Sequence, residues 1–237
     1  GNNVLCKKCN TIYGSFHDHP DFLGDSELQH PGRWVKFMRG IYAKVYTPVT
    51  NLMFLPAGGA GKARIEVLER LEVNPGDRVL ETGMGAGDNL PYLHDMFEMG
   101  EYHGLDIQKQ MIRLCSRNLK KWDMEAVICR ADAESLPYPD ESFDCVFHLG
   151  AINLFIDKKK AIDEMIRVAK GGTKIVIADE SEKAGKLINI FMGKQEEIVP
   201  PVDLVPDSME DINLEYICRD YGYLIEFRKP VGDSANK

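Results

Sequence analysis

The feature that most constrains the fold is a turn with three glycines that follows a short apolar run. Gly83, Gly85 and Gly87 come directly after this strand-like run and its acid, Glu81. Glycines at this spacing allow a tight turn and let a ligand approach the backbone closely. Residues 89–96 then predict a helix, whose free N–H groups at the N-terminus favour a ligand with an anionic end.

The spacing of these glycines distinguishes three kinds of ligand site. A dinucleotide site needs G-x-G-x-x-G, but Asp88 stands at the third glycine position, where a carboxylate would oppose a pyrophosphate. A phosphate loop needs G-x-x-x-x-G-K-[ST], and the stretch around Lys62 has Pro56 and Ala63 at two required positions. The pattern that fits is [DE]-x-G-x-G-x-G.

Three later segments extend this pattern. Residues 102–107 and 126–131 read as strands that lead to Asp106 and Asp132, and residues 163–172 read as a helix followed by a glycine turn. An acid at the end of the second strand can accept both ribose hydroxyls of a nucleoside. In content and order these segments resemble the class I S-adenosylmethionine (SAM) methyltransferases, and the chain is similar to their UbiE-like small-molecule branch.

The resemblance implies a fold and a cofactor. The fold is α/β and Rossmann-like: a seven-stranded, mostly parallel sheet with an antiparallel C-terminal hairpin and helices on both faces. SAM is the implied cofactor and S-adenosylhomocysteine the implied product. Met84 and Lys170 depart from the small residue and the proline that are usual in the family, which leaves the subfamily open.

Strand-like and helix-like segments alternate along the chain, as a parallel sheet with helices on both faces requires. We predict strands at 78–83, 102–107, 126–131, 143–149 and 174–180, a helix at 62–73, and a hairpin from 214–219 and 223–228. Ligands of such sheets bind beyond the carboxyl ends of the strands, so the acids at these ends are expected to line one crevice.

The resemblance also implies which residues hold the cofactor. Glu81 and the glycines would shape the methionine pocket, and Asp106 would hold the ribose. Asn89, with Asp88, would either bind the methionine amino group or cap the helix. The expected cofactor contacts are Glu81, Gly83, Met84, Gly85, Gly87, Asn89, Asp106, Ile107, Met111, Asp132, Ala133, His148, Leu149, Tyr42 and Tyr46.

Two candidate catalytic residues follow the fourth predicted strand, in a segment that faces the methyl group in related enzymes. His148 is either a general base, since its ordinary pKa lies near working pH, or a residue that lines the cofactor. Asn153 either orients the acceptor or caps the next turn. Because the methyl group of SAM is already activated, alignment and exclusion of water can suffice, and a base need not be visible in the sequence.

Residues 1–30 are predicted to be an irregular N-terminal segment, and residues 31–237 the methyltransferase domain. Cys6 and Cys9 form a single C-x-x-C, which is half of the four ligands that a zinc ribbon needs. His17 and His19 do not complete a known ribbon spacing, so we expect no bound metal, and zinc in particular is not expected.

Two segments of the larger domain have alternative interpretations. Residues 33–55 show the apolar spacing of an amphipathic helix, which either packs on the core or closes over the cofactor with Tyr42 and Tyr46. Residues 181–209 contain a second apolar stripe that predicts either a core helix or a cover for the substrate.

Bulk properties exclude several classes of protein. The 237 residues carry a formal net charge of −8 and no basic stripe, so no nucleic-acid partner is expected. No transmembrane segment is expected, because no apolar run approaches the length of a bilayer span. Residues 1–3, Gly-Asn-Asn, do not resemble the start of a signal peptide, so none is expected. Six scattered cysteines give no disulfide framework, which predicts a cytoplasmic location. The oligomeric state is left open.

The predicted function is SAM-dependent methyl transfer to a small-molecule acceptor that is apolar or resembles a lipid or quinone. The methylated atom, whether carbon, nitrogen, oxygen or sulfur, is not determined by any residue. One alternative is a regulatory module that binds SAM without turnover. Another is a protein or RNA methyltransferase, which would need a basic groove or an N/D-P-P-Y motif where this chain has residues 148–151.

Overall fold

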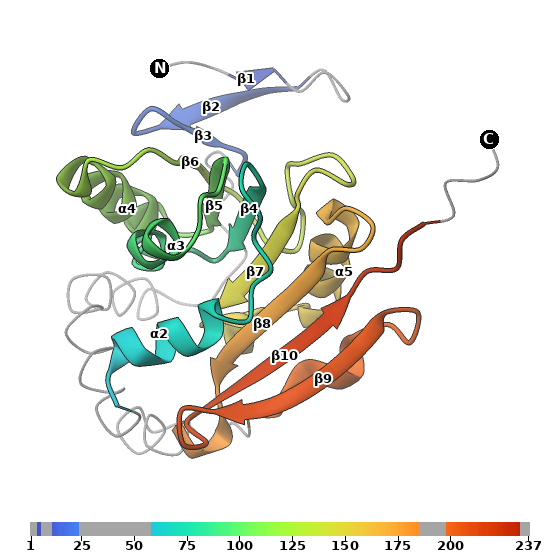
Figure 1. The fold of residues 1–237 in the computed structure, drawn as a ribbon. Helices are drawn as coiled ribbons and strands as arrows, with labels where there is room; N and C mark the ends of the chain where they lie inside the picture. Colours follow the sequence, from blue (N-terminus) through green and yellow to red (C-terminus); the bar gives the residue numbers. More distant parts are fainter. Residues whose placement is uncertain (1–3, 6–10, 24–57, 185–197, 233–237) are drawn as a thin grey trace.

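The computed structural model describes residues 4–5, 11–23, 58–184 and 198–232 (Figure 1). One sheet runs through them in the order β1-β2-β3-β6-β5-β4-β7-β8-β10-β9. Its strands are β1 (Val4–Leu5), β2 (Ile12–Phe16), β3 (His19–Asp21), β4 (Arg78–Thr82), β5 (Glu101–Asp106), β6 (Val127–Arg130), β7 (Cys145–Leu149), β8 (Lys174–Glu180), β9 (Glu210–Ile217) and β10 (Gly222–Arg228).

The centre of the sheet is parallel and its C-terminal edge is antiparallel. Strands β6, β5, β4, β7 and β8 pair in parallel, whereas β10 runs antiparallel to both β8 and β9. This arrangement confirms the Rossmann-like fold expected from the sequence. The central strands are buried on both faces, and accordingly β7 and β8 contain continuous apolar runs, whereas β4 and β5 also bury polar residues such as Glu81 and His103.

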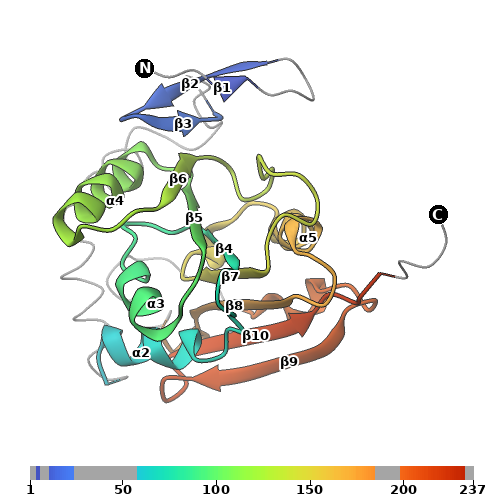
Figure 2. The ribbon, with the colours of Figure 1, turned by 45° about the horizontal axis from the view of Figure 1, so that its top comes forward.

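Helices cover both faces of the sheet (Figure 2). The helices are α2 (Ala60–Leu68), α3 (Leu90–Met96), α4 (Lys109–Trp122) and α5 (Lys158–Val168), with short 3-10 turns η2 (Ile152–Leu154) and η3 (Pro201–Leu204). Helices α2, α3 and α4 lie on one face, which we call the α2–α4 face, and α5 lies on the other, the α5 face. Asp157 begins α5 by accepting a hydrogen bond from the backbone N–H of Lys160 at 3.0 Å.

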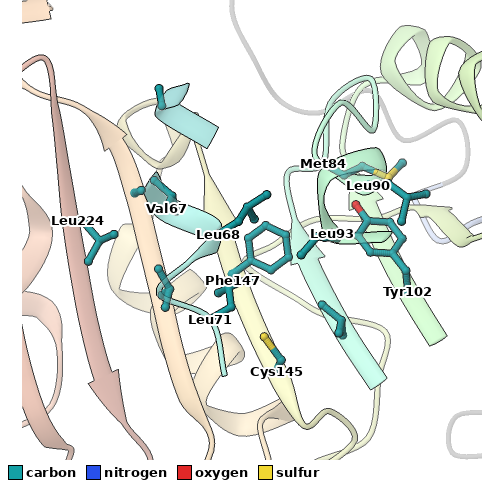
Figure 3. Packing of buried hydrophobic residues seen from close by; sticks show 14 of the residues in the cluster. Val67, Leu68, Leu71, Met84, Leu90, Leu93, Tyr102, Cys145, Phe147 and Leu224 are labelled. Carbon is teal, nitrogen blue, oxygen red and sulfur yellow. The ribbon is translucent and has the colours of Figure 1, made fainter. Parts of the chain in front are cut away.

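Each face has its own apolar core. On the α2–α4 face, Leu68 of α2 and Leu93 of α3 pack with Phe147 of β7 and Tyr102 of β5 (Figure 3). On the α5 face, buried residues of α5 such as Met165 pack with the side chains of β4, β7, β8 and β10 that alternate to that side. The strand register therefore determines which face receives each polar side chain.

Residues 1–30 were predicted to be irregular, but the described part of this segment forms strands β1 to β3. β3 pairs in parallel with β6, opposite Arg130, and extends the sheet. Asp21 accepts two hydrogen bonds from Nη1 of Arg130, at 3.0 and 3.1 Å, and both side chains are buried. The hairpin between β2 and β3 turns at His17 and Asp18, which both have positive φ. Such turns usually contain glycine or asparagine, and neither residue stands at these two positions, so the hairpin could not be predicted from its turn.

Other boundaries differ less from the predictions. The helix predicted over 62–73 spans Ala60–Leu68, and the C-terminal hairpin begins earlier, at Glu210. Residues 33–55 and the apolar stripe at 185–197 lie outside the described residues. Residues 198–209 are described and include η3, which packs near α5. Within the described ranges, no helix has both the length and the apolar character needed to cross a bilayer.

Candidate functional site

The glycine turn after β4 has the backbone geometry that its sequence predicts. Gly83, Gly85 and Gly87 all have positive φ, at 69°, 56° and 77°. At Gly87 a side chain is excluded twice, because a Cβ would also lie 2.7 Å from Sγ of Cys115. The turn therefore keeps the start of α3 close to the ends of β4 and β5.

Glu81 lies fully buried beneath this turn, and both of its carboxylate oxygens are hydrogen-bonded. Asn89 donates to Oε1 from its side-chain amide at 2.6 Å, and the Tyr102 hydroxyl donates to Oε2 at 2.5 Å. Burial raises the pKa of Glu81 to about 7, against the opposing effect of these two hydrogen bonds. Glu81 thus holds α3 and β5 against β4.

Arg64 of α2 joins the same group, and sequence reasoning missed it. Its Nε donates to Oδ1 of Asn89 at 2.9 Å, and its Nη2 lies 3.6 Å from Oδ2 of Asp88. Asn89 therefore links a carboxylate to a guanidinium and makes no side-chain cap of α3. No motif marked Arg64 because it stands 25 residues before its partner, in an ordinary helix.

Asp106 ends β5 with its carboxylate fixed toward the glycine turn. Oδ2 accepts the backbone N–H of Gly85 at 3.1 Å, and Oδ1 accepts the backbone N–H of Gln108 at 2.7 Å. These two hydrogen bonds hold the carboxylate in one orientation beside the turn. The structure thus brings Asp106 and the glycine turn together, as the sequence predicts.

The remaining expected cofactor contacts lie near the ends of β5, β6 and β7. Asp132 follows β6, is partly exposed, and accepts the backbone N–H of Glu134 at 2.9 Å. Ala133 and Met111 are buried, whereas Ile107 and Leu149 are partly exposed. The parallel register of β4, β5, β6 and β7 places all of these strand ends at one edge of the sheet.

Met84 has a packing role in the turn. Its side chain is buried in the core of the α2–α4 face, and its sulfur lies 3.8 Å from Sγ of Cys115. Gly104 of β5 makes room for it, since a Cβ at that position would stand 2.3 Å from the methionine sulfur. This pairing accounts for a large residue where the family usually has a small one.

His148 lies at the end of β7 but points to the α5 face. Its Nδ1 donates to the backbone carbonyl of Thr82 at 2.7 Å, and its ring meets Phe155 edge-on. The side chain is fully buried, and Nε2 has no hydrogen-bond partner among the described residues. Burial lowers the pKa of His148 to about 4, so the ring is neutral near pH 7.

Asn153 is held by hydrogen bonds within the protein. Its side-chain amide donates to the carbonyl of Glu180 at 3.0 Å, and its carbonyl oxygen accepts from the Tyr223 hydroxyl at 3.0 Å. Its backbone N–H donates to Oδ2 of Asp179 at 2.8 Å. These contacts tie the turn after β7 to the ends of β8 and β10.

Two groups of predicted residues cannot be placed. Tyr42 and Tyr46 lie outside the described residues, as do Cys6 and Cys9. Across the described ranges, no cluster of three or more His, Cys, Asp or Glu side chains is arranged to hold a metal ion.

Comparison with known families gives a direct match. The model of a family described as a methyltransferase domain matches residues 73–215, a range that begins before β4 and ends within β9. The matched range thus contains the glycine turn, the acids after β4 and β5, and the segment after β7.

Curated relatives match over about half of this chain. The phthiotriol/phenolphthiotriol dimycocerosates methyltransferase of Mycobacterium leprae is 34% identical over 113 residues, which cover 47% of this chain and 41% of the relative. The fatty-acid O-methyltransferase of Mycolicibacterium smegmatis is 34% identical over 44% of this chain and 37% of its own length. The demethylmenaquinone methyltransferase of Alkalihalophilus pseudofirmus is 32% identical, over 50% of this chain and 51% of the relative. The match therefore spans about half or less of each relative.

A solved structure gives the same fold. The phosphoethanolamine N-methyltransferase 2 of Haemonchus contortus, in complex with phosphomonomethylethanolamine and S-adenosylhomocysteine, aligns with a TM-score of 0.61. The alignment covers 73% of this chain and 53% of that one, at 16% identity. At this identity the likeness concerns the fold alone.

Proposed function

This chain belongs to the methyltransferase domain family, and from that premise we propose that it transfers a methyl group from SAM to a small, mainly apolar acceptor. The observation that carries the proposal is the fixed carboxylate of Asp106 beside the glycine turn after β4. The sheet edge at which these groups meet is where ligands of parallel α/β sheets bind.

The residues after β4 and β5 fit a cofactor with an amino acid end and a nucleoside end. The oriented carboxylate of Asp106 would hold the ribose, while Asp132 and Ala133 would lie at the adenine edge. Glu81 acts through Asn89 and Arg64, which place an amide and a guanidinium near the methionine end. Bound SAM would supply a methyl group already activated by the sulfonium.

The chain's own contribution to the chemistry is alignment and exclusion of water. The turn at Gly83 packs directly against the buried ring of His148, since a Cβ at Gly83 would lie 3.0 Å from Cε1 of that ring. We assign His148 and Asn153 to this support, because their hydrogen bonds go to the protein backbone or to Tyr223.

The acceptor class rests on the names of the relatives. Two of these enzymes are named for a fatty acid and for demethylmenaquinone. These names support an apolar acceptor that resembles a lipid or quinone. A cytoplasmic location and the lack of a nucleic-acid partner and of zinc stay predictions from the sequence.

A transfer screen tests the proposal. Purified protein is incubated with SAM labelled in its methyl group and with pools of long-chain alcohols, amines, fatty acids and quinones. We expect label in one organic pool, and calorimetry should show binding of both SAM and S-adenosylhomocysteine. Binding of SAM without transfer to any pool would favour the regulatory module, and absence of SAM binding would refute the proposal.

A further inference from the structure

Strand β8 ends in two adjacent acids that face opposite sides of the sheet. Successive side chains of a strand alternate between its faces. Asp179 stands opposite Tyr223 of β10 and bonds with the turn after β7 on the α5 face. Glu180 stands opposite Gly222 and therefore faces the α2–α4 side, as its neighbour Ala178 does.

The carboxylate of Asp179 is fully engaged. Oδ2 accepts the backbone N–H of Asn153 at 2.8 Å, and Oδ1 accepts the backbone N–H of Glu180 at 2.8 Å. The side chain is 7% exposed. Asp179 is therefore a structural acid that fixes the turn after β7.

The carboxylate of Glu180 lacks such partners. Among the described residues, none donates a hydrogen bond to it and no cation pairs with it. Its side chain is only partly exposed, and the apolar side chain of Ile217 on β9 covers Gly222 opposite, 3.2 Å from where a Cβ would stand. Burial, with the negative charge of Asp179, raises the pKa of Glu180 to about 8. A ligand that donates a hydrogen bond or carries a positive charge would stabilise the ionised form of such an acid.

Glu180 shares its sheet face with the cofactor site. Glu81 follows Val79 by two residues on β4, and Glu180 follows Ala178 by two residues on β8, while Val79 and Ala178 belong to one core cluster. Leu149, the last residue of β7, stands opposite Ala178 between them. Figure 1 shows the ends of β7 and β8 directed to the side of the molecule where α2 lies. Glu180 thus ends β8, which pairs with β7, and β7 in turn pairs with β4, the strand that leads into the glycine turn.

We propose that Glu180 holds the reacting head group of the acceptor and takes its proton, so that the acceptor carries an amine or a hydroxyl and not a carboxylate. This proposal rests on the proposed function. A carboxylate head group would meet the negative charge of Glu180, which is paired with no cation among the described residues, and like charges repel. An N–H or O–H group would instead donate to the open oxygen of Glu180.

Methyl transfer to such an acceptor releases one proton, and Glu180 is the group that accepts it. The acceptor's nitrogen or oxygen forms a bond to the methyl carbon as the carbon–sulfur bond of the sulfonium breaks, and the electron pair of that bond stays on sulfur. The acceptor's proton passes to the carboxylate of Glu180, which becomes a carboxylic acid and later loses the proton to water. A proton acceptor with a pKa near working pH suits this exchange.

The charged groups around Glu180 determine how binding depends on pH. Asp179 on β8 is the acid that acts on it, and Tyr223 on β10 lies close to both acids. Lys158 of α5 acts on Asp179 from the opposite face. His148 on β7 points to that same opposite face and stays neutral. Glu81 on β4 shares the face of Glu180 and has a pKa of about 7, but both of its oxygens accept hydrogen bonds within the protein. Glu180 is therefore the open carboxylate whose ionisation would change a ligand's binding near pH 8.

A binding experiment tests the site without turnover. Dodecyltrimethylammonium, a cation that cannot accept a methyl group, is titrated into the protein by calorimetry, with dodecanoate as the anionic probe. We expect binding of the cation to strengthen as the pH rises from about 6 to about 9, because Glu180 becomes charged in that range. Glu180→Gln should weaken it by about tenfold or more, the effect of losing a charged partner.

Matched variants control this experiment. Glu182→Gln removes an exposed carboxylate two residues further along and should bind the cation like the wild type. Glu180→Gln should keep its folding and its affinity for SAM, because it replaces a carboxylate that the protein does not stabilise. Cation binding that is absent in the wild type, unchanged in Glu180→Gln, or weaker than dodecanoate binding would overturn the proposal.

A second arm measures the reaction with dodecylamine and dodecanol as acceptors. The wild-type rate should rise with pH through about 8, and Glu180→Gln should flatten that rise and lower kcat while SAM affinity is unchanged. Equal rates and equal pH profiles for the two proteins would refute the role of Glu180. Failure of the wild type to bind SAM would instead refute the proposed function, since the cation titration requires no SAM.

Discussion

The acids at the edge of the sheet differ between its two halves. At the ends of β4 and β5, Glu81 and Asp106 each accept hydrogen bonds on both carboxylate oxygens. At the end of β8, Glu180 accepts none from the described residues. A carboxylate already fixed by hydrogen bonds binds a ligand without the entropic cost of ordering its side chain. A carboxylate without such hydrogen bonds can gain a partner from a bound ligand. On the proposed function, Glu81 and Asp106 belong to a cofactor half of the sheet edge and Glu180 belongs to an acceptor half.

The largest expected effect concerns packing in the cofactor half. Gly104→Val would drive a Cβ into the sulfur of Met84, 2.3 Å away, and should lower the free energy of unfolding by about 3 kcal/mol. Urea unfolding measures the loss. Gly14→Val in β2 is the matched control, since nothing lies within 4 Å of its added Cβ. Equal stability of the two variants would show that the cofactor half is not tightly packed.

The next largest effect concerns Asp106, which is proposed to hold the ribose, and it should appear in the affinity for SAM. We expect Asp106→Ala to weaken SAM binding by about 1–3 kcal/mol, because two backbone N–H groups and the ligand lose their acceptor. Calorimetry gives the affinity. Asp157→Ala removes the side-chain cap of α5, which bonds only the backbone N–H of Lys160, and should lower stability without changing affinity. Unaltered SAM affinity in Asp106→Ala would contradict the assignment.

Tyr102→Phe tests the buried acid of the cofactor half. Tyr102 lowers the pKa of Glu81, so its loss should raise that pKa above about 7. A raised acid pKa destabilises the folded state as the pH rises through the range between the unfolded and folded values. The variant should therefore lose about 1–2 kcal/mol relative to the wild type near pH 8 and less near pH 5. Thermal unfolding at both pH values measures this, and a gap that does not widen with pH would exclude the linkage.

The smallest effect should come from His148→Asn. Asparagine can donate to the Thr82 carbonyl as Nδ1 does, so stability should change by about 1 kcal/mol or less. The pH profile of transfer should also be unchanged between about pH 5 and about pH 8, because His148 already has a pKa of about 4. A steep fall in kcat with unchanged SAM affinity would instead make His148 the base, and it would weaken the case for Glu180.

The sequence predicted the cofactor half better than the acceptor half. The glycine spacing and the acids after two strands are local patterns, and Gly83, Gly85, Gly87 and Asp106 meet as expected. Their supporting partners are not local. Tyr102 lies 21 residues from Glu81, and only the paired strands bring the two together.

Glu180 could not be identified from its sequence context. It follows an apolar strand beside Asp179, and the two acids look equivalent in the sequence. Their difference arises from the sheet register and from the turn after β7, which supplies a backbone N–H to Asp179 alone. The N-terminal strands were missed for a similar reason, since the left-handed turn at His17 and Asp18 lacks the usual glycine.

The pairing of β3 with β6 also bears on how the chain acquires its structure. Asp21 and Arg130 are separated by 109 residues. During synthesis β3 leaves the ribosome long before its partner strand exists, and contacts this distant in sequence form slowly because a long loop must close first. The N-terminal hairpin can therefore join the sheet only after β6 has been made, so the Asp21–Arg130 pair forms later than the hairpin itself.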